Sequence, residues 1–569
     1  MNYHWKFRQE YEKGTDIEFA KRLKLPRSLA QVLISRNLKT SEEVEKFFKP
    51  TLSDLHNPFL MKDMDKVVDR LILAVKNKEL IWVHGDYDVD GTASTAMVCQ
   101  FITEIGGEIK YYIPDRFTEG YGLSEKSISL GLSYGAKVLL TVDVGITSYN
   151  PLDFAKKYED LDVIICDHHE PGDTVPEVFA VIDPLRPQDD YPFKGLAACG
   201  VAFKIIHAIS LKLNCEEKAM SYLDFVALAS VADSVPLVDE NRILVHHGLS
   251  LMNKNLRPGL KGLMYCTGLR GGSMTASNIV FSVAPLINAA GRLGDAKRSV
   301  EMMMQKNEIA AFRIAQELEE ENRRRRIFDQ QTFEEAIPMA DELVKDPNCR
   351  VLVIHKDTWH AGVIGIVASR LVDRYNMPAI LMTTLEGIAK GSARSISSFD
   401  IHSALKKCSD LMIEFGGHRF AAGLSLDIAN VPELRRRIND YAHEYLSLEM
   451  LKPEILIDAE LKLNELSPMF FKTLDFFAPY GFHNIKPVFF SRNVQSVNGI
   501  KVFGNNNIRF RAKQNNFVID AIGNNLAHKI SLCTRNKKFK IVYNLEETAH
   551  LGARSPQLNI IDIQPEAVE

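Results

Sequence analysis

The sequence predicts an α/β protein of several domains, in which two sheet-containing blocks are joined by a long helix and followed by a small β-barrel. Three observations lead to this fold class. Short apolar runs alternate with amphipathic stretches early in the chain, which is typical of βαβ units around a buried parallel sheet. A charged, glycine-free stretch with helical spacing follows, and the last part is rich in β-branched and aromatic residues with Asn and Gly turns. A chain of 569 residues is also too long for one core.

The first half of the chain contains the clearest pattern. Residues 1–55 predict short helices, and SEEVEKFFKP is typical of a capped helix that ends at Pro50. Residues 56–306 predict the first α/β domain. Its buried strands are expected in the apolar runs ELIWVHGD, GEIKYYIPD, AKVLLTVDVG, LDVIICDHH and FAVIDP. Helical stretches such as TASTAMVCQFITEI and YNPLDFAKKYE separate them, and this spacing favours strands over helix for the apolar runs.

The second half predicts three further parts. Residues 307–345 predict one connecting helix, weakened near Pro338. Within 346–450 the order CRVLVIHKD, GVIGIVASRLVDRY and MPAILMT predicts a strand, a helix and a strand of a second α/β domain. Residues 451–569 predict the barrel.

Composition excludes several classes of protein. The chain is 46% hydrophobic and 25% charged with a net charge of −4, as in ordinary globular proteins. Its apolar runs are shorter than the ~18 residues that suggest a membrane span. The N-terminal MNYHWKFRQEYEKG lacks the apolar core of a signal peptide. Eight scattered cysteines without a CxxC pair predict reduced thiols. We therefore expect a cytoplasmic monomer that does not associate with membranes.

Acidic and histidine side chains follow most of the predicted strands. The set comprises His84, Asp86, Asp88, Asp90, Asp143, Asp167, His168, His169, Asp183 and Asp233. Ligands of open α/β sheets bind beyond the carboxyl ends of the strands, so these side chains should converge. Converging carboxylates repel one another, and divalent cations would neutralise them. Two cations ~3.5–4 Å apart suit a phosphoryl displacement. We expect Asp183 instead to cap a turn before Pro184.

Four motifs make the chain resemble the DHH phosphoesterase superfamily: HGDYDVDG, TVDVG, CDHHE and ASVADSVPL, in this order. APLINAAGRLGDA is similar to the branch that digests single-stranded DNA, while WHAGVIGIVASRL, GSARS and FGGHRFAAG resemble the DHH-associated domain. The resemblance covers most of the chain. It implies a metal-dependent exonuclease that hydrolyses single-stranded DNA from 5′ to 3′ to mononucleotides, in recombination and repair.

The resemblance also assigns roles to residues. Two divalent cations, Mn²⁺ or Mg²⁺, would be held by His84, Asp88, Asp90, Asp143, His168 and Asp233. Asp143 would bridge the two cations. For His84 the alternative is that it does not bind a cation directly and supports the residues that do. His169 would contact the scissile phosphate, and Asp167 would fix a histidine through a hydrogen bond. Further phosphates would be held by Arg116, Arg292, His360, Arg394, Gly416, Gly417 and His418. For the glycines, a tight turn or close packing is the alternative interpretation.

The expected barrel is strongly basic. Residues 491–542 include ten Lys or Arg residues and a single acid, Asp520. The basic residues that we assign to nucleic-acid binding are Arg509, Arg511, Lys513, Lys537 and Lys538. Interleaved phenylalanines favour an OB-fold that binds single strands, although at least half of them should form the core. One stretch, APYGFHNIKPVFF, departs from the family pattern of a glycine-rich segment with an Asn-Pro pair.

Single-stranded DNA is therefore the expected substrate, with a helicase and a single-strand-binding protein as possible partners. Two other functions are compatible with parts of the pattern. A DHH phosphodiesterase for short oligonucleotides or small phosphate esters would need only the two α/β domains. A non-catalytic replication scaffold of the DHH type should have lost metal ligands, whereas the full set is present here. Preference for DNA over RNA rests on the resemblance, because no residue is seen to exclude a 2′-hydroxyl.

Overall fold

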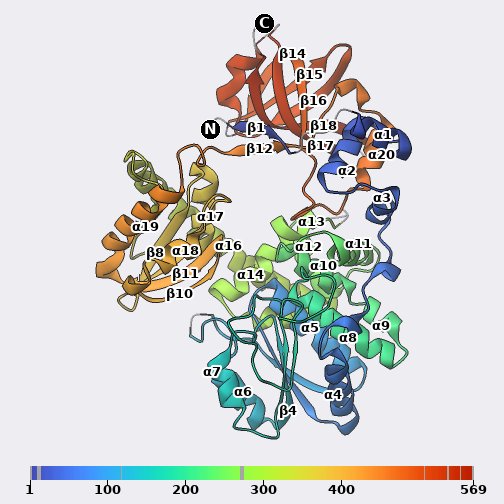
Figure 1. Ribbon diagram of the computed structural model, residues 1–569, viewed down its shortest axis with the longest axis vertical. Coiled ribbons are helices and arrows are strands. Elements are labelled where there is room, and N and C mark those ends of the chain that lie inside the picture. The colour runs from blue at the N-terminus through green and yellow to red at the C-terminus, as the bar shows by residue number, and fades with distance from the viewer. Residues whose placement is uncertain are drawn as a thin grey trace. The chain divides into compact units, whose positions relative to one another are not determined.

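The computed structural model describes residues 3–8, 14–116, 118–269, 274–504, 506–534, 537–550 and 553–566. The chain forms two compact units, Met1–Asp54 with Pro453–Glu569 and Leu55–Lys452 (Figure 1). The α/β fold class with parallel strands and a C-terminal barrel is confirmed. None of the described helices combines the length and apolar character that a membrane crossing requires.

The first sheet of the Leu55–Lys452 unit is entirely parallel. Its described strands have the order β3-β2-β4-β5-β6. They are β2 Leu80–Gly85, β3 Glu108–Tyr112, β4 Ala136–Val142, β5 Asp162–Cys166 and β6 Ala180–Ile182. Strand β4 is buried at six of its seven positions, as expected for a strand covered on both faces. All five carboxyl ends therefore lie at one edge of the sheet.

Helices surround this sheet and extend the domain. They are α4 Met64–Asn77, α5 Val89–Glu104, α6 Glu125–Ser133, α7 Tyr149–Ala155, α8 Ala198–Lys212, α9 Glu216–Met220, α10 Leu223–Ala232, α11 Asp239–Lys254, α12 Pro258–Cys266, α13 Ala276–Asn278, α14 Ala284–Leu293 and α15 Lys297–Met304, with a π-helix, η3, at Ile279–Val283. Helices α5, α8 and α10 contact one another and are buried along most of their length. They bring the loops after β2 and α10 to the same edge of the sheet.

Helix α16, Glu308–Leu343, is the long connecting helix. It continues through Pro338, so the expected weakening is absent. The proline removes one backbone hydrogen bond, but Ala336 and Ala340 on either side are fully buried in the core of the second α/β domain. This packing holds the helix together across the proline.

The second sheet of the same unit is mixed, with the order β10-β11-β9-β8-β7. Only the β7–β8 pair is parallel within the described part of this sheet. The elements are β7 Leu352–His355, α17 Ile364–Tyr375, β8 Ala379–Leu385, β9 Ile388–Arg394, α18 Ile401–Lys406, β10 Met412–His418, β11 Ala421–Asp427 and α19 Val431–Tyr445. Helix α17 packs on β8 and β9 and leaves the β10 edge exposed.

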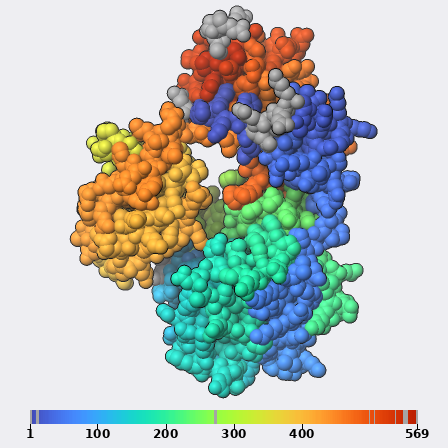
Figure 2. Space-filling view, viewed as in Figure 1, coloured from blue at the N-terminus to red at the C-terminus, as the bar shows by residue number. Residues whose placement is uncertain are grey.

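The other unit combines the two ends of the chain. Its elements are β1 His4–Phe7, α1 Thr15–Leu23, α2 Arg27–Ser35, α3 Ser41–Phe48, β12 Glu454–Ile457, β13 Ala459–Glu460, α20 Pro468–Asp475, β14 Phe489–Phe503, β15 Asn507–Gln514, β16 Phe517–Gly523, β17 Phe539–His550 and β18 Ala553–Pro565. The sheet order β13-β14-β15-β16-β18-β17 closes into a barrel through β14–β17 pairing. Leu29 and Leu33 of α2 share one core with Phe477 and Phe539. The blue N-terminal helices accordingly lie against the orange C-terminal segment in Figure 2.

Candidate active site

The segment from the end of β2 into the first turn of α5 carries three aspartates within five residues: Asp86 and Asp88 lie in the loop, and Asp90 is the second residue of α5. Asp88 caps α5, because its Oδ1 accepts the backbone N–H of Gly91 at 3.0 Å. Gly91 allows a tight loop, since a Cβ there would lie 2.6 Å from the backbone of Asp86. Asp86 and Asp90 are almost completely buried. The loop therefore places charged side chains where solvent alone cannot neutralise them.

Among the described side chains, three groups have the spacing to hold a metal ion. They are Asp86 with Asp88 and Asp143, Asp90 with His168 and Asp233, and Asp143 with His168 and His169. In each group the ligand atoms lie within 4.8 Å of one another. We call the members of the three groups together the acidic cluster. Asp143 and His168 each belong to two groups and so connect the cluster.

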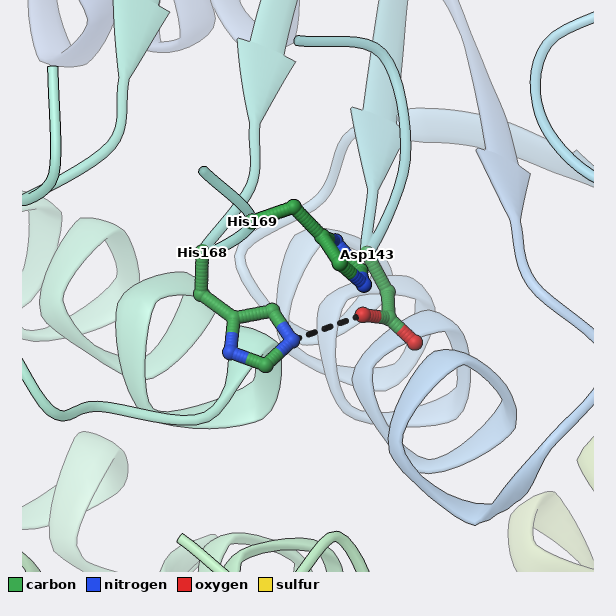
Figure 3. Close-up of side chains that lie close together, drawn as sticks. All are labelled: Asp143, His168 and His169. Atoms are coloured by element: carbon green, nitrogen blue, oxygen red, sulfur yellow. Dashed lines mark ion pairs between the residues drawn. The ribbon is translucent and has the colours of Figure 1, made fainter. Parts of the chain in front are cut away.

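The ring of His168 points toward the carboxylate of Asp143 (Figure 3) and also lies near two further carboxylates of the acidic cluster. Its Nε2 is 3.2 Å from Oδ1 of Asp143, 3.8 Å from Oδ2 of Asp90 and 3.9 Å from Oδ2 of Asp233. Its Nδ1 lies 3.2 Å from the carbonyl oxygen of Leu196, which orients the ring. Asp143 occupies the left-handed region of the backbone, with φ 65°. A non-glycine residue in that region costs free energy and is often found at functional sites.

The electrostatics of the acidic cluster favour a bound cation. Burial, and then the carboxylates of Asp90 and Asp88, raise the pKa of Asp143 well above its usual range. Burial and then Asp90 raise the pKa of Asp233 to about 8. Asp86 has a buried Oδ1 for which the described residues offer no hydrogen-bond partner. Carboxylates with one or two imidazoles and no thiolate are the donor set that manganese and, with fewer histidines, magnesium accept. The residues therefore fit two divalent cations.

Asp167 and His169 form a hydrogen-bonded pair beside the cluster. Oδ1 of Asp167 lies 2.7 Å from Nδ1 of His169 and accepts the N–H of His168 at 2.8 Å, while Oδ2 accepts the N–H of Ile146 at 3.0 Å. Burial acts to raise the pKa of Asp167, but the hydrogen bond from His169, the charge of that ring and the N–H of Ile146 together outweigh it, so the pKa is lowered. An ionised Asp167 fixes a proton on Nδ1 of His169.

Tyr121 is a site residue that the sequence analysis missed. Its hydroxyl lies 3.2 Å from Nε2 of His169 and 3.3 Å from the carbonyl oxygen of Asp143. The side chain is about half exposed, at 54%. The glycine-flanked EGYGL segment places it there, but only its position in a loop after β3 could have been inferred from the sequence.

Asp90 is held from a second direction. Its carboxylate accepts the N–H groups of Ala198 and Cys199, both at 2.8 Å, at the N-terminus of α8. A helix N-terminus stabilises a negative charge. The four lone-pair directions of a carboxylate leave Asp90 able to bind a metal as well.

His84 and Asp183 lie outside the three groups formed by the described side chains. His84 is fully buried, and its ring nitrogens lie 2.7 Å from Ser127 Oγ and 3.2 Å from the Gly122 carbonyl oxygen. Burial lowers the pKa of His84 to about 4. The group that contains Asp88 and Asp143 has Asp86 as its third member, whereas the resemblance implies His84 there. Asp183 Oδ1 accepts the N–H of Leu185 at 2.8 Å, as expected for a turn.

A pocket of about 760 Å³ lies between the two α/β domains of the Leu55–Lys452 unit. We call it the arginine pocket, because Arg116 and Arg292 line it from the first domain and Arg394 from the second. Burial, and then the neighbouring guanidinium groups of Arg116, Arg325 and Arg394, lower the pKa of Arg292 to about 10. Tyr121 also lines the pocket and so connects it with His169. Guanidinium groups that lie close enough to repel one another suit phosphate.

Glycine and serine complete the arginine pocket. Gly365 and Ser392 line it, and Arg394 Nη1 donates to Ser392 Oγ at 3.0 Å. A Cβ at Gly365 would lie 2.8 Å from that hydroxyl oxygen, so a larger residue would fill the space. Gly417 also lines the pocket.

Three other predicted phosphate contacts are not part of the lining: His360, Gly416 and His418. His360 stacks on Phe328 of α16, with ring centroids 5.3 Å apart. Gly416 and His418 lie on the exposed edge strand β10.

Three of the basic residues assigned to nucleic-acid binding fall on one face of β15. Arg509 and Arg511 of β15 are exposed and Lys513 is half-buried, while Ile508, Phe510 and Ala512 between them form core. Lys537 and Lys538 are also exposed. Among the interleaved phenylalanines, Phe510 and Phe539 are buried, Phe517 is partly buried, and Phe503 is 43% exposed. Arg535 lies outside the described residues.

The fold and the site together define a phosphoesterase of the DHH class. Residues 80–230 match the DHH family, N-terminal domain, residues 347–444 the DHHA1 domain and residues 457–562 the RecJ OB domain. The single-stranded-DNA-specific exonuclease RecJ of Dickeya dadantii is 31% identical over 564 residues, covering 95% of this chain and 96% of the relative. RecJ of Bacillus subtilis is 34% identical over 537 residues, covering 94% and 67%. The chain therefore belongs to the RecJ family of single-stranded-DNA-specific exonucleases.

Solved structures agree with this family. The structure of RecJ in complex with Mn²⁺ from Thermus thermophilus has a TM-score of 0.84 and 26% identity, and the match covers 100% of this chain and 80% of that chain. The corresponding Mg²⁺ complex has a TM-score of 0.77 and 25% identity, covering 100% and 79%.

Proposed function

We propose that this protein is a metal-dependent exonuclease that hydrolyses phosphodiester bonds of single-stranded DNA. The observation that carries the proposal is the junction of two oppositely charged sites in one unit. The acidic cluster suits divalent cations, the arginine pocket suits phosphates, and Tyr121 contacts His169 while lining the pocket. A phosphodiester bound across this junction would be in contact with both.

Two divalent cations, Mn²⁺ or Mg²⁺, would supply an activated water and neutralise charge on the reacting phosphate. The residues that would hold them are Asp86, Asp88, Asp90, Asp143, His168 and Asp233. We assign Asp143 as the shared ligand, because it belongs to two of the groups. His84, with both ring nitrogens in contact with Ser127 and Gly122, would support the loop behind these ligands.

Side chains around the cluster would orient the strand. His169 carries its proton on Nδ1 when Asp167 is ionised, and its Nε2 contacts the hydroxyl of Tyr121, which lines the arginine pocket. A phosphate that approaches from the pocket would meet this ring and could accept a hydrogen bond from it in the imidazolium form. Arg116, Arg292 and Arg394 would hold neighbouring phosphates, and Gly417 would allow the backbone to approach them.

Each part of the chain has a place in this proposal. We assign catalysis to residues 56–306, phosphate binding to 346–450, with 307–345 as the connection, and strand binding to 451–569. Residues 1–55 would support the barrel, since α2 shares its core. The outward arginines of β15, with Lys513, Lys537 and Lys538, would track the backbone of a single strand, and the exposed Phe503 could stack on a base.

The finer features of the activity rest on the likeness to the RecJ family. We infer digestion from the 5′ end, release of mononucleotides and a role in recombination and repair. A helicase and a single-strand-binding protein would supply the substrate to a monomeric enzyme in the cytoplasm. His360, Gly416 and His418 would contact more distant parts of the strand.

Digestion of end-labelled oligonucleotides tests the proposal. Linear single strands and 5′ single-stranded tails should be degraded to mononucleotides with Mn²⁺ or Mg²⁺, whereas blunt duplexes should resist. Circular single-stranded DNA is the control, because it offers the same backbone and bases without an end. Rapid cutting of pure circles would contradict exonuclease action. Hydrolysis limited to di- and trinucleotides would instead indicate a phosphodiesterase for small substrates.

A further inference from the structure

Helix α14 contacts the segment that carries Asp86, Asp88 and Asp90, which runs from the loop after β2 into the first turn of α5. Oδ1 of Asn288 accepts the backbone N–H of Val89 at 3.1 Å. Val89 lies between Asp88 and Asp90 in the sequence and is the first residue of α5. Its N–H is one of the four at a helix N-terminus that have no partner within the helix. Asn288 therefore binds the peptide group between Asp88 and Val89, in the short segment that connects the proposed metal ligands Asp88 and Asp90.

Two glycines let the backbone of α14 approach closely on both sides. A Cβ at Gly291 would lie 2.7 Å from the carbonyl oxygen of Tyr87, inside the same loop. A Cβ at Gly362, before α17, would lie 2.7 Å from the carbonyl oxygen of Arg292. Arg292 itself lines the arginine pocket. Because residues four apart lie on the same face of a helix, Asn288 and Arg292 join the loop to the pocket through one helical turn.

We propose that Asn288 is a positioning residue, which holds the Asp88–Asp90 peptide in the orientation that binds the cations. The proposal rests on the function proposed above. The proposal gives a role to Asn288, the asparagine of APLINAAGR. This residue is neither a proposed metal ligand nor a proposed phosphate contact. Without the acceptor, the Val89 N–H has to find water, and the carboxylates on either side are free to rotate away from Asp143. Loss of such outer partners lowers metal affinity or activity by roughly 10- to 100-fold.

The test is Asn288→Leu, which keeps the size of the side chain and removes the acceptor. We expect Mn²⁺ affinity, measured by isothermal titration calorimetry, and kcat to fall by roughly 10- to 100-fold. KM for a short single strand should stay within about threefold, because Arg292 and the rest of the pocket remain. Asn288→Asp keeps an acceptor at the same place and should restore Mn²⁺ binding to within about threefold of the wild type.

Asn278→Leu is the matched control. Asn278 is also half-buried, and its Oδ1 also accepts a backbone N–H, from Thr275 at 3.0 Å, but in the capping box of α13. The Asn278→Leu variant should leave Mn²⁺ affinity unchanged.

If Asn288→Leu does not fold, Asn288→Ala is measured in the same way. Wild-type Mn²⁺ affinity in a folded Asn288 variant without an acceptor would overturn the inference. Failure of the wild type to digest single strands would overturn the proposed function alone, since Mn²⁺ binding is measured separately.

Discussion

The two sheets of the Leu55–Lys452 unit present functional groups in different ways. In the parallel sheet every strand ends at the same edge, so Asp86, Asp143 and Asp167 after β2, β4 and β5 come together. In the mixed sheet the antiparallel strand β9 instead carries Ser392 and Arg394 on a face beside α17. The first arrangement concentrates negative charge for cations, and the second leaves small residues and the guanidinium group of Arg394 for anions. We therefore expect changes at the first sheet to lower kcat and changes at the second to raise KM.

The largest effect is expected at Asp143. Asn is the suitable replacement, because it tolerates the left-handed φ of 65° at this position while removing the charge that two ligand groups share. We expect Asp143→Asn to lower kcat by a factor of roughly 100 to 1,000, with binding of a single strand nearly unchanged. Steady-state hydrolysis and fluorescence anisotropy measure the two quantities. The control is Asp183→Asn, at the end of β6. A variant at Asp143 that retains a tenth of the turnover with full metal content would contradict the shared-ligand role.

A smaller loss is expected at Asp167, which binds no metal in this proposal. Asp167→Asn removes the ionised acceptor 2.7 Å from Nδ1 of His169, so the ring is no longer held in one tautomer. We expect kcat to fall by roughly 10- to 100-fold while Mn²⁺ affinity stays within about threefold. Asp173→Asn, at an exposed position of the same loop, is the control. A loss of Mn²⁺ binding as large as the loss of kcat would place Asp167 among the ligands.

The sequence could predict that acidic side chains gather at the carboxyl edge of the first sheet. The length and spacing of the apolar runs indicate the strands, and the acids stand where these strands end. Buried apolar runs that end in acids are sufficient once the strands are parallel. The sequence analysis left open whether His84 binds a metal directly, because His84 lies near the end of β2 and only the fold shows that its ring meets Ser127 of α6. The Tyr121 hydroxyl and the Asn288 amide contact residues that are distant from them in the sequence. No local sequence pattern could therefore predict these contacts.

The smaller unit shows the same limit. Strand β1 has four residues with no alternating burial, and it pairs in parallel with β12, Glu454–Ile457, at the other end of the chain. Such pairing depends on tertiary context more than on the propensity of the strand. The capped helix α3 is the opposite case: Thr40 and Glu43 form a capping box within four residues, and the local stretch SEEVEKFFKP was enough to predict the helix.

At the second sheet we expect Arg394→Ala to raise KM about tenfold with a smaller change in kcat, because charged hydrogen bonds to phosphate are lost. Arg394→Lys should recover part of the loss, since an ammonium keeps the charge without the forked geometry. Arg419→Ala is the control, because that arginine is exposed nearby and does not line the pocket. A fall in kcat at unchanged KM would show that the mixed sheet acts on the reacting phosphate and would remove the contrast between the sheets.

The smallest effect is expected from substitutions in the barrel, where the charged side chains point outward from a strand face instead of gathering at a sheet edge or in a pocket. Arg509 and Arg511 alternate with core residues on β15, so both point outward and neither supports the fold from inside. Each phosphate contact to a single strand contributes about 0.7 to the slope of log K against log salt concentration. The double variant Arg509→Ala/Arg511→Ala should therefore reduce that slope by about 1.4 and weaken binding of long strands, with kcat on a short oligonucleotide unchanged.

The control is the double variant Lys462→Ala/Lys472→Ala, which removes the same charge from exposed positions outside the barrel strands and should leave the slope unchanged. An unchanged slope in the arginine variant would show that long strands do not follow β15. Equal slopes for long and short strands would place all phosphate contacts in the arginine pocket.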